Sequence, residues 1–109
     1  MDGTNGFARL QEEIHRVAVE HGWWERDRPV GEVLMLAVTE LAEAMEAYRE
    51  GNPQSEKVPG FSKMEEELAD TIIRILDFAG GMNLDLDGAL RAKMRYNETR
   101  PYRHGGKLA

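Results

Sequence analysis

Two pairs of acidic residues stand at helical spacing in the middle of the chain. The stretch TELAEAMEA places Glu40 and Glu43 three residues apart, and ELADTIIR places Glu67 and Asp70 three residues apart. Residues at this spacing share one face of an α-helix. Carboxylate oxygens, without histidine or cysteine, are the ligands that Mg²⁺ or Mn²⁺ prefers. The spacing predicts a divalent-cation site between two helices, and the alternative is two ordinary solvated helix faces.

The surroundings of Glu40 favour the cation site. On a helix its neighbours are mostly apolar and small: Val33, Leu36, Ala37, Ala44 and Ala47, with Glu43 as the exception. A lone carboxylate in such surroundings tends to take up a proton, and two adjacent carboxylates repel each other. A divalent cation removes both costs. Glu46, Glu50, Glu65 and Glu66 are interpreted as surface charge.

Four helical stretches must position these acids. Apolar periodicity predicts helices over residues 7–21, 29–50, 62–79 and from 85 or 87 to about 97. Gly22, Gly51 and the pair Gly80 and Gly81 are the expected stops, and Ser62 with Glu65 forms a capping box. No segment has the period of a strand. The prediction is one all-α domain over residues 1–109, a bundle of antiparallel helices with short links, in which residues 98–109 form a C-terminal arm.

The second helix carries an apolar stripe beside its acids. Its members are Leu34, Val38, Leu41, Met45 and Tyr48. Residues at this spacing normally face the interior of a bundle. We expect this stripe to form the main core.

Composition narrows the class of protein. The chain has 109 residues, no cysteine and a net charge of −6, which argues against thiolate metal sites and against nucleic acid as a partner. It contains no apolar run of membrane-spanning length and no secretory leader. The expectation is a cytoplasmic protein without a membrane partner. The basic stretch over residues 91–107 contrasts with the acidic middle and suggests a small polyanion bound together with a metal ion, or else a solvated tail.

Three motifs together resemble those of the MazG-like, all-α nucleoside triphosphate pyrophosphohydrolases. They are ELAE at 40–43, ELADTIIR at 67–74 and KMRYNETRPYRHGGK at 93–107, so the resemblance covers roughly residues 20–107. It implies a four-helix bundle that assembles as a homodimer or homotetramer. It also implies Mg²⁺-dependent cleavage of a (d)NTP between the α and β phosphates, giving a (d)NMP and pyrophosphate, as house-cleaning of the nucleotide pool. Thr39 stands where many relatives have a further acid, so the number of metal ions stays open.

The resemblance implies the metal ligands, and the spacing and chemistry of other side chains suggest the remaining roles. Glu40, Glu43, Glu67 and Asp70 would be the metal ligands, and Glu40 or Glu43 would be the general base for water. Lys93, Asn97 and Arg100 share a face of the fourth helix and would bind phosphate, while His104 and Lys107 would close over the triphosphate. Trp24 would stack on the base, with Trp23 in the core. Arg74 would contact phosphate, or pair with Asp70 or Asp77.

Other functions fit parts of the pattern. A phosphoribosyl-ATP hydrolase or a dUTP/dUDP hydrolase would share the helical plan. A non-catalytic helical dimerisation module would explain the apolar stripes but not Glu40. A di-iron bundle would use Glu12 and His15 as an E-x-x-H element, but it needs a second such element that the chain lacks, so both residues are expected at the surface.

Overall fold

The computed structural model describes residues 6–102, whose regular secondary structure is helical. The four helices are α1 (Gly6–Glu20), α2 (Val30–Arg49), α3 (Lys63–Gly81) and α4 (Leu86–Glu98). Within this part of the chain the all-α prediction is confirmed, and each helix begins and ends within two residues of its predicted bounds. No helix among the described residues has the length and apolar character needed to cross a membrane.

Local signals in the sequence set most helix ends. Ser62 Oγ accepts a hydrogen bond from the Glu65 amide at 3.1 Å, and Glu65 Oε1 accepts one from the Ser62 amide at 2.8 Å. This confirms the capping box at the start of α3. Asp85 Oδ1 accepts from the Gly88 amide at 2.9 Å and caps α4. Gly51 takes a φ of +89° directly after α2, as expected of a helix stop.

The end of α3 differs from the prediction. Gly80 and Gly81 were expected to stop the helix, but they form its last turn, and Asn83, with a φ of +57°, follows it. A Cβ atom on Gly80 would lie 2.6 Å from His15 Cβ, and one on Gly81 would overlap the Trp24 ring. These glycines therefore serve close packing against α1 and the α1–α2 linker rather than helix termination.

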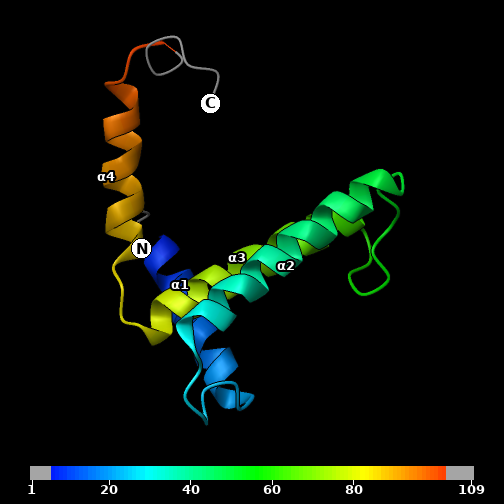
Figure 1. Ribbon diagram of the computed structural model, residues 1–109, viewed down its shortest axis with the longest axis horizontal. Helices are drawn as coiled ribbons and strands as arrows, with labels where there is room; N and C mark the ends of the chain where they lie inside the picture. The colour runs from blue at the N-terminus through cyan, green and yellow to red at the C-terminus, as the bar shows by residue number, and fades with distance from the viewer. Residues whose placement is uncertain (1–5, 103–109) are drawn as a thin grey trace.

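Helices α2 and α3 lie side by side and form the centre of the molecule (Figure 1). Their buried apolar residues are mostly small: Val33, Ala44 and Ala47 on α2, and Leu76 and Ala79 on α3. Small side chains let the two backbones approach closely. The Glu40 side chain lies on this packed face and is only 14% exposed, on the same helix as the buried Ala44 and Ala47.

The prediction of the main core stripe is wrong for a single chain. All five stripe residues, Leu34, Val38, Leu41, Met45 and Tyr48, are between 47% and 64% exposed. The small-residue face of α2 packs on α3 instead, because it permits the closer approach. Helix α4 has its main contact with α1, so the four helices do not close into one bundle within one chain (Figure 1).

A buried carboxylate ties α1 and the α1–α2 linker to α3. Asp77 is 8% exposed, and its Oδ1 accepts a hydrogen bond from Trp24 Nε1 at 2.8 Å and lies 2.9 Å from His15 Nδ1. Its Oδ2 accepts from Arg28 at 3.1 Å. A buried carboxylate needs such partners, because an oxygen that is removed from water without a hydrogen bond destabilises the folded state. The prediction that His15 lies at the surface is wrong: it is half-buried in this network.

The packing of Trp24 on Gly81 gives a stability test. Gly81→Ala should lower the free energy of unfolding by about 1–3 kcal/mol, because the added methyl group collides with the indole ring. Gly31→Ala is the matched control, since a Cβ at Gly31 has no atom within 4 Å. It should leave stability unchanged or raise it by up to about 1 kcal/mol. Urea denaturation measures both, and equal stability of the two variants would contradict this packing.

Candidate metal centre

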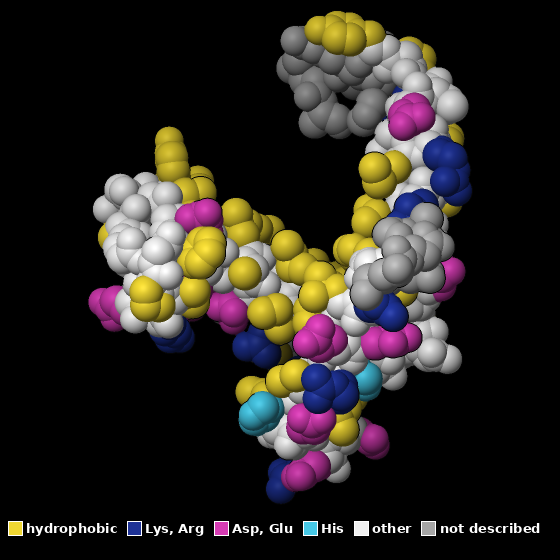
Figure 2. All heavy atoms as spheres, turned by 180° about the vertical axis from the view of Figure 1, so that it is seen from behind, with side chains coloured by type: hydrophobic (Ala, Val, Ile, Leu, Met, Phe, Trp, Pro, Cys, Tyr) yellow, Lys and Arg dark blue, Asp and Glu magenta, His cyan; other side chains and the backbone are white. Residues whose placement is uncertain are grey.

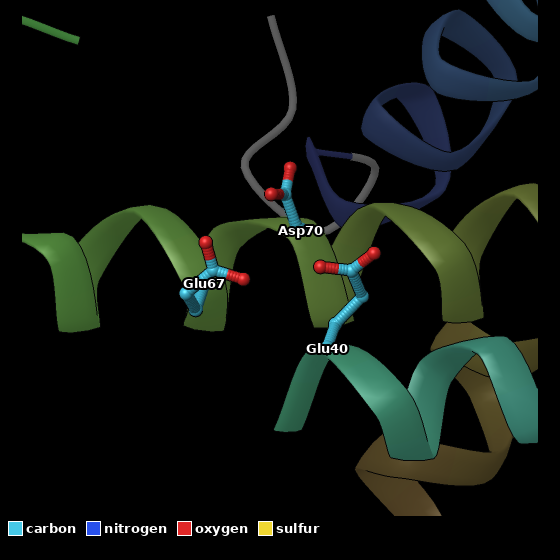
Figure 3. Close-up of side chains that lie close together, drawn as sticks. All are labelled: Glu40, Glu67 and Asp70. Atoms are coloured by element: carbon cyan, nitrogen blue, oxygen red, sulfur yellow. The ribbon is translucent and has the colours of Figure 1, made fainter. Parts of the chain in front are cut away.

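Three of the four predicted carboxylates converge between α2 and α3. Glu40, Glu67 and Asp70 each offer one oxygen, and these oxygens lie within 4.8 Å of one another. Figure 3 shows Glu40 projecting from α2 toward the two acids of α3. Glu43 is outside this group but lines the same cavity one turn further along α2. The helical spacing of each pair, combined with the close packing of α2 on α3, is what brings the acids together.

Glu67 is the most constrained of these residues. Its side chain is 5% exposed, and its Oε2 is buried without a hydrogen-bond partner among the described residues. Burial, together with the neighbouring carboxyls of Glu43 and Glu40, raises the pKa of Glu67 to about 8. Burial and the charges of Glu40 and Glu66 also raise the pKa of Asp70, although Lys57 and Arg74 act in the opposite direction.

This environment fits a hard divalent cation. An unpartnered buried oxygen is normally costly, and repulsion among the acids adds to that cost. A cation among the three carboxylates would satisfy the oxygen and neutralise the repulsion. Arg74 supplies one counter-charge from α3, because its guanidinium donates to Glu40 Oε1 at 3.3 Å. The expected pairing of Arg74 with Asp70 or Asp77 is not the one observed, since its guanidinium pairs with Glu40 across the α2–α3 interface.

The carboxylates line one side of a cavity of about 530 Å³. A cavity of this size can hold a nucleotide-sized molecule. Its other walls include Trp23, His21, Lys57 and apolar residues of α1. The cavity therefore combines anionic, cationic and aromatic surfaces within one hollow.

The two tryptophans exchange their expected places. Trp23, expected in the core, lines the cavity and is 54% exposed, with the Arg74 guanidinium 5.7 Å from its ring centroid. Trp24, expected to stack on a base, does not line the cavity; it packs against Gly81 and donates to Asp77. Adjacent residues after a helix stop point in different directions, and only tertiary packing decides which one is covered.

The predicted phosphate-binding residues of α4 are not brought to the cavity within one chain. The ammonium of Lys93 and the guanidinium of Arg100 lie over the Tyr96 ring, 4.6 Å and 5.6 Å from its centroid. Asn97 is exposed on the same helix, and none of the three lines the cavity. His104 and Lys107 lie outside the described residues. The basic surface and the acidic cavity are therefore separate in a single copy.

Sequence reasoning missed Lys57 and the role of Asp77. Lys57 lies in the loop between α2 and α3, where no periodicity indicates which way a side chain points. Asp77 did carry a signal, because Glu67, Asp70, Arg74 and Asp77 follow one another at helical spacing along α3. Among the described residues, the acid cluster that could hold a metal contains no histidine, so nothing supports the di-iron alternative.

Comparisons of the chain with protein-family models, with curated proteins and with solved structures found no match. The chemistry of the cavity must therefore be argued from its own residues.

The raised pKa of Glu67 predicts how stability depends on pH. The folded state holds a proton up to about pH 8, whereas an ordinary glutamate releases it near 4.5. Between these values the unfolded state binds fewer protons, so the free energy of unfolding of the metal-free protein falls as pH rises. In EDTA, we expect the midpoint of thermal unfolding to fall by at least about 10 °C between about pH 5 and about pH 8.

Glu67→Gln is the control, because a neutral amide mimics the protonated acid. It should lose most of this pH dependence and exceed the parent in stability at pH 8 in EDTA. Excess Mg²⁺ should stabilise the parent more than the variant, because a ligand that binds the folded state raises its stability and the variant has lost one charged ligand. An unchanged pH profile in Glu67→Gln would contradict the burial of an unpaired carboxyl at this position.

Proposed function

We propose that the protein is a Mg²⁺-dependent nucleoside triphosphate pyrophosphohydrolase. It cleaves a (d)NTP between the α and β phosphates to a (d)NMP and pyrophosphate. The observation that carries the proposal is the convergence of Glu40, Glu67 and Asp70 in a cavity of nucleotide size. The resemblance of its acidic motifs to the MazG-like enzymes supports the same activity, and a role in cleaning the nucleotide pool follows by analogy.

The side chains of the cavity suit this reaction. Glu40, Glu67 and Asp70 would hold the metal, which when bound supplies Lewis-acid stabilisation of phosphate charge. Glu43 lines the cavity outside the three-oxygen group, so it is the better placed of the two predicted bases to orient a water and accept its proton.

Two further residues of the cavity would hold the rest of the nucleotide. Arg74 lies between Glu40 and the face of Trp23, from which its guanidinium can turn to a phosphate. Trp23 offers an exposed ring for stacking on the base. The reacting phosphate would therefore lie between the acids and Arg74, with the base toward the aromatic wall.

We also infer that the active form is a homodimer or homotetramer. Hydrophobic side chains line the inner side of the angle between the α2–α3 pair and α4 (Figure 2). Besides the stripe of α2, the exposed apolar residues include Leu68, Ile72 and Ile75 of α3 and Leu90 and Met94 of α4, all more than 40% exposed. The radius of gyration is 16.5 Å, whereas a compact chain of this length would have about 13 Å. A second copy would cover these faces and could bring α4, with Lys93, Asn97 and Arg100, toward the other copy's acids.

The assembly is tested by sedimentation equilibrium at micromolar concentration. We expect a mass two or four times that of one chain, because apolar faces of this size are seldom left in water. Leu41→Glu should shift the protein to monomers, since it places a charge in the centre of the exposed stripe. A parent protein that is monomeric at every concentration would contradict the inference.

The activity is tested with a panel of NTPs and dNTPs in Mg²⁺, with the products resolved by chromatography. We expect a monophosphate and pyrophosphate. Glu40→Gln and Asp70→Asn should each lower the rate by at least about 100-fold while helical circular dichroism is retained, because each removes a charged ligand. Glu46→Gln is the matched control on α2, since Glu46 is exposed and pairs with Arg49 at 3.7 Å.

Other product patterns would decide between the remaining functions. Release of a diphosphate and orthophosphate would overturn cleavage at the α phosphate. Hydrolysis confined to phosphoribosyl-ATP, or to dUTP and dUDP, would favour one of the related hydrolases. Full activity in either acid variant would refute the metal-site assignment. A protein that dimerises but binds no Mg²⁺ or Mn²⁺ in calorimetry would be a non-catalytic helical module.

A further inference from the structure

The loop between α2 and α3 is fixed in place by its own hydrogen bonds. The amide of Ser55 donates to the carbonyl of Phe61 at 2.9 Å, and the amide of Lys63 donates to the carbonyl of Pro53 at 2.8 Å. Asn52 Oδ1 accepts from the amide of Met64 at 2.9 Å. The base of the loop is thus closed by contacts between its two ends, and its tip has little freedom relative to the first turn of α3.

A buried hydroxyl holds the backbone at the tip of this loop. Ser55 is 4% exposed, and its Oγ donates to Glu66 Oε1 at 2.6 Å. The same oxygen accepts from the amides of Lys57 and Val58 at 3.2 Å and 3.0 Å. Buried polar groups with all partners satisfied specify one local conformation. The position of the Lys57 backbone beside α3 is therefore set by α3 itself, through Glu66.

Lys57 brings a cation to the acidic cavity from this loop. Its side chain lines the cavity together with Glu40, Glu43, Glu67 and Asp70, and its charge lowers the pKa of Asp70. Within the described residues no carboxylate oxygen lies within 4.0 Å of its ammonium, whereas Arg74 is engaged by Glu40. Lys57 is thus close enough to act on the acids electrostatically but keeps its three donors for another partner.

We propose that Lys57 is a substrate-binding residue that contacts the phosphate oxygens of a bound triphosphate on the side of the cavity next to Asp70. This rests on the proposed function, since it names a further residue of that site. An ammonium is a compact charge with three donors and suits phosphate oxygens. It cannot assist a dication, because the two charges repel. Lys57 should therefore oppose metal binding in the absence of phosphate and favour phosphate binding once the metal is present.

Two binding measurements on Lys57→Ala test this assignment, because the affinities for the metal and for pyrophosphate should change in opposite directions. Mn²⁺ binding without nucleotide, followed by electron paramagnetic resonance, should become about 3-fold tighter, because a nearby positive charge is removed. Binding of inorganic pyrophosphate to the Mg²⁺-loaded protein, followed by calorimetry, should become about 10-fold weaker, because a charge-assisted hydrogen bond is lost. Lys57→Arg should restore most of the pyrophosphate affinity, since it keeps the charge.

Lys63→Ala is the matched control. Lys63 is the first residue of α3, directly after the same loop, but it lies 3.9 Å from Glu50 and does not line the acidic cavity. Its removal should change both affinities by less than about 2-fold, because a more distant, solvated charge is screened.

The outcomes separate this inference from the proposed function. If Lys57→Ala keeps the parent's pyrophosphate affinity and KM while Glu40→Gln abolishes activity, the role of Lys57 is refuted and the function stands. If no nucleotide is hydrolysed by the parent, the function fails, and the opposite changes in Mn²⁺ and pyrophosphate affinity still establish Lys57 as a phosphate-binding residue. The inference would be overturned if Lys57→Ala bound both Mn²⁺ and pyrophosphate more weakly, or if the parent did not bind pyrophosphate.

Discussion

The close approach of acidic side chains across the α2–α3 interface is the constraint on which the rest of the structure depends. Glu67 is almost fully buried, and one of its oxygens has no hydrogen-bond partner among the described residues. Such a group is stable in only two ways: it holds a proton, or it has a cation beside it. The charge of the interface is therefore expected to change with pH, and the proposed cation would take the place of the proton.

The close packing of α2 on α3 makes this approach possible. Ala44 and Ala47 bring the helix backbones close enough for carboxylates on the two helices to meet. Helix α3 turns its polar residues, from Glu67 to Asp77, toward α2 and α1, and Asp77 fastens α1 and the linker through His15, Trp24 and Arg28. Most of the larger apolar residues of both helices are exposed, which is why the proposal of a second copy belongs to the same account as the metal site.

Local periodicity and capping made the helices predictable from the sequence. The same periodicity placed Glu40 beside small apolar residues of its own helix, and across the interface its neighbours are Arg74 and the acids of α3. The choice of packing face could not be made this way, because α2 offers two apolar faces and the larger one, with Leu41 and Met45, was taken for the core. Single-sequence patterns do not distinguish a face that packs within the chain from a face that remains exposed on it.

The aromatic and cationic walls of the cavity could not be predicted from the sequence for a related reason. Trp23 and Trp24 are adjacent in a linker, and their different environments arise from the glycine surface of α3 and the carboxylate of Asp77. Lys57 lies in a loop whose shape depends on a buried contact between Ser55 and Glu66. Each of these placements requires two segments to meet, so none has a signal within one segment.

The most direct test of the metal centre is the number of protons released when Mn²⁺ binds at pH 7. It is obtained from calorimetric titrations in buffers of different ionisation enthalpy, because metal ligands must be deprotonated. With the pKa of Glu67 raised to about 8, the metal-free protein should release close to one proton per bound ion, and Glu67→Gln should release almost none. Binding without proton release in the parent, or the absence of a specific site, would contradict the account.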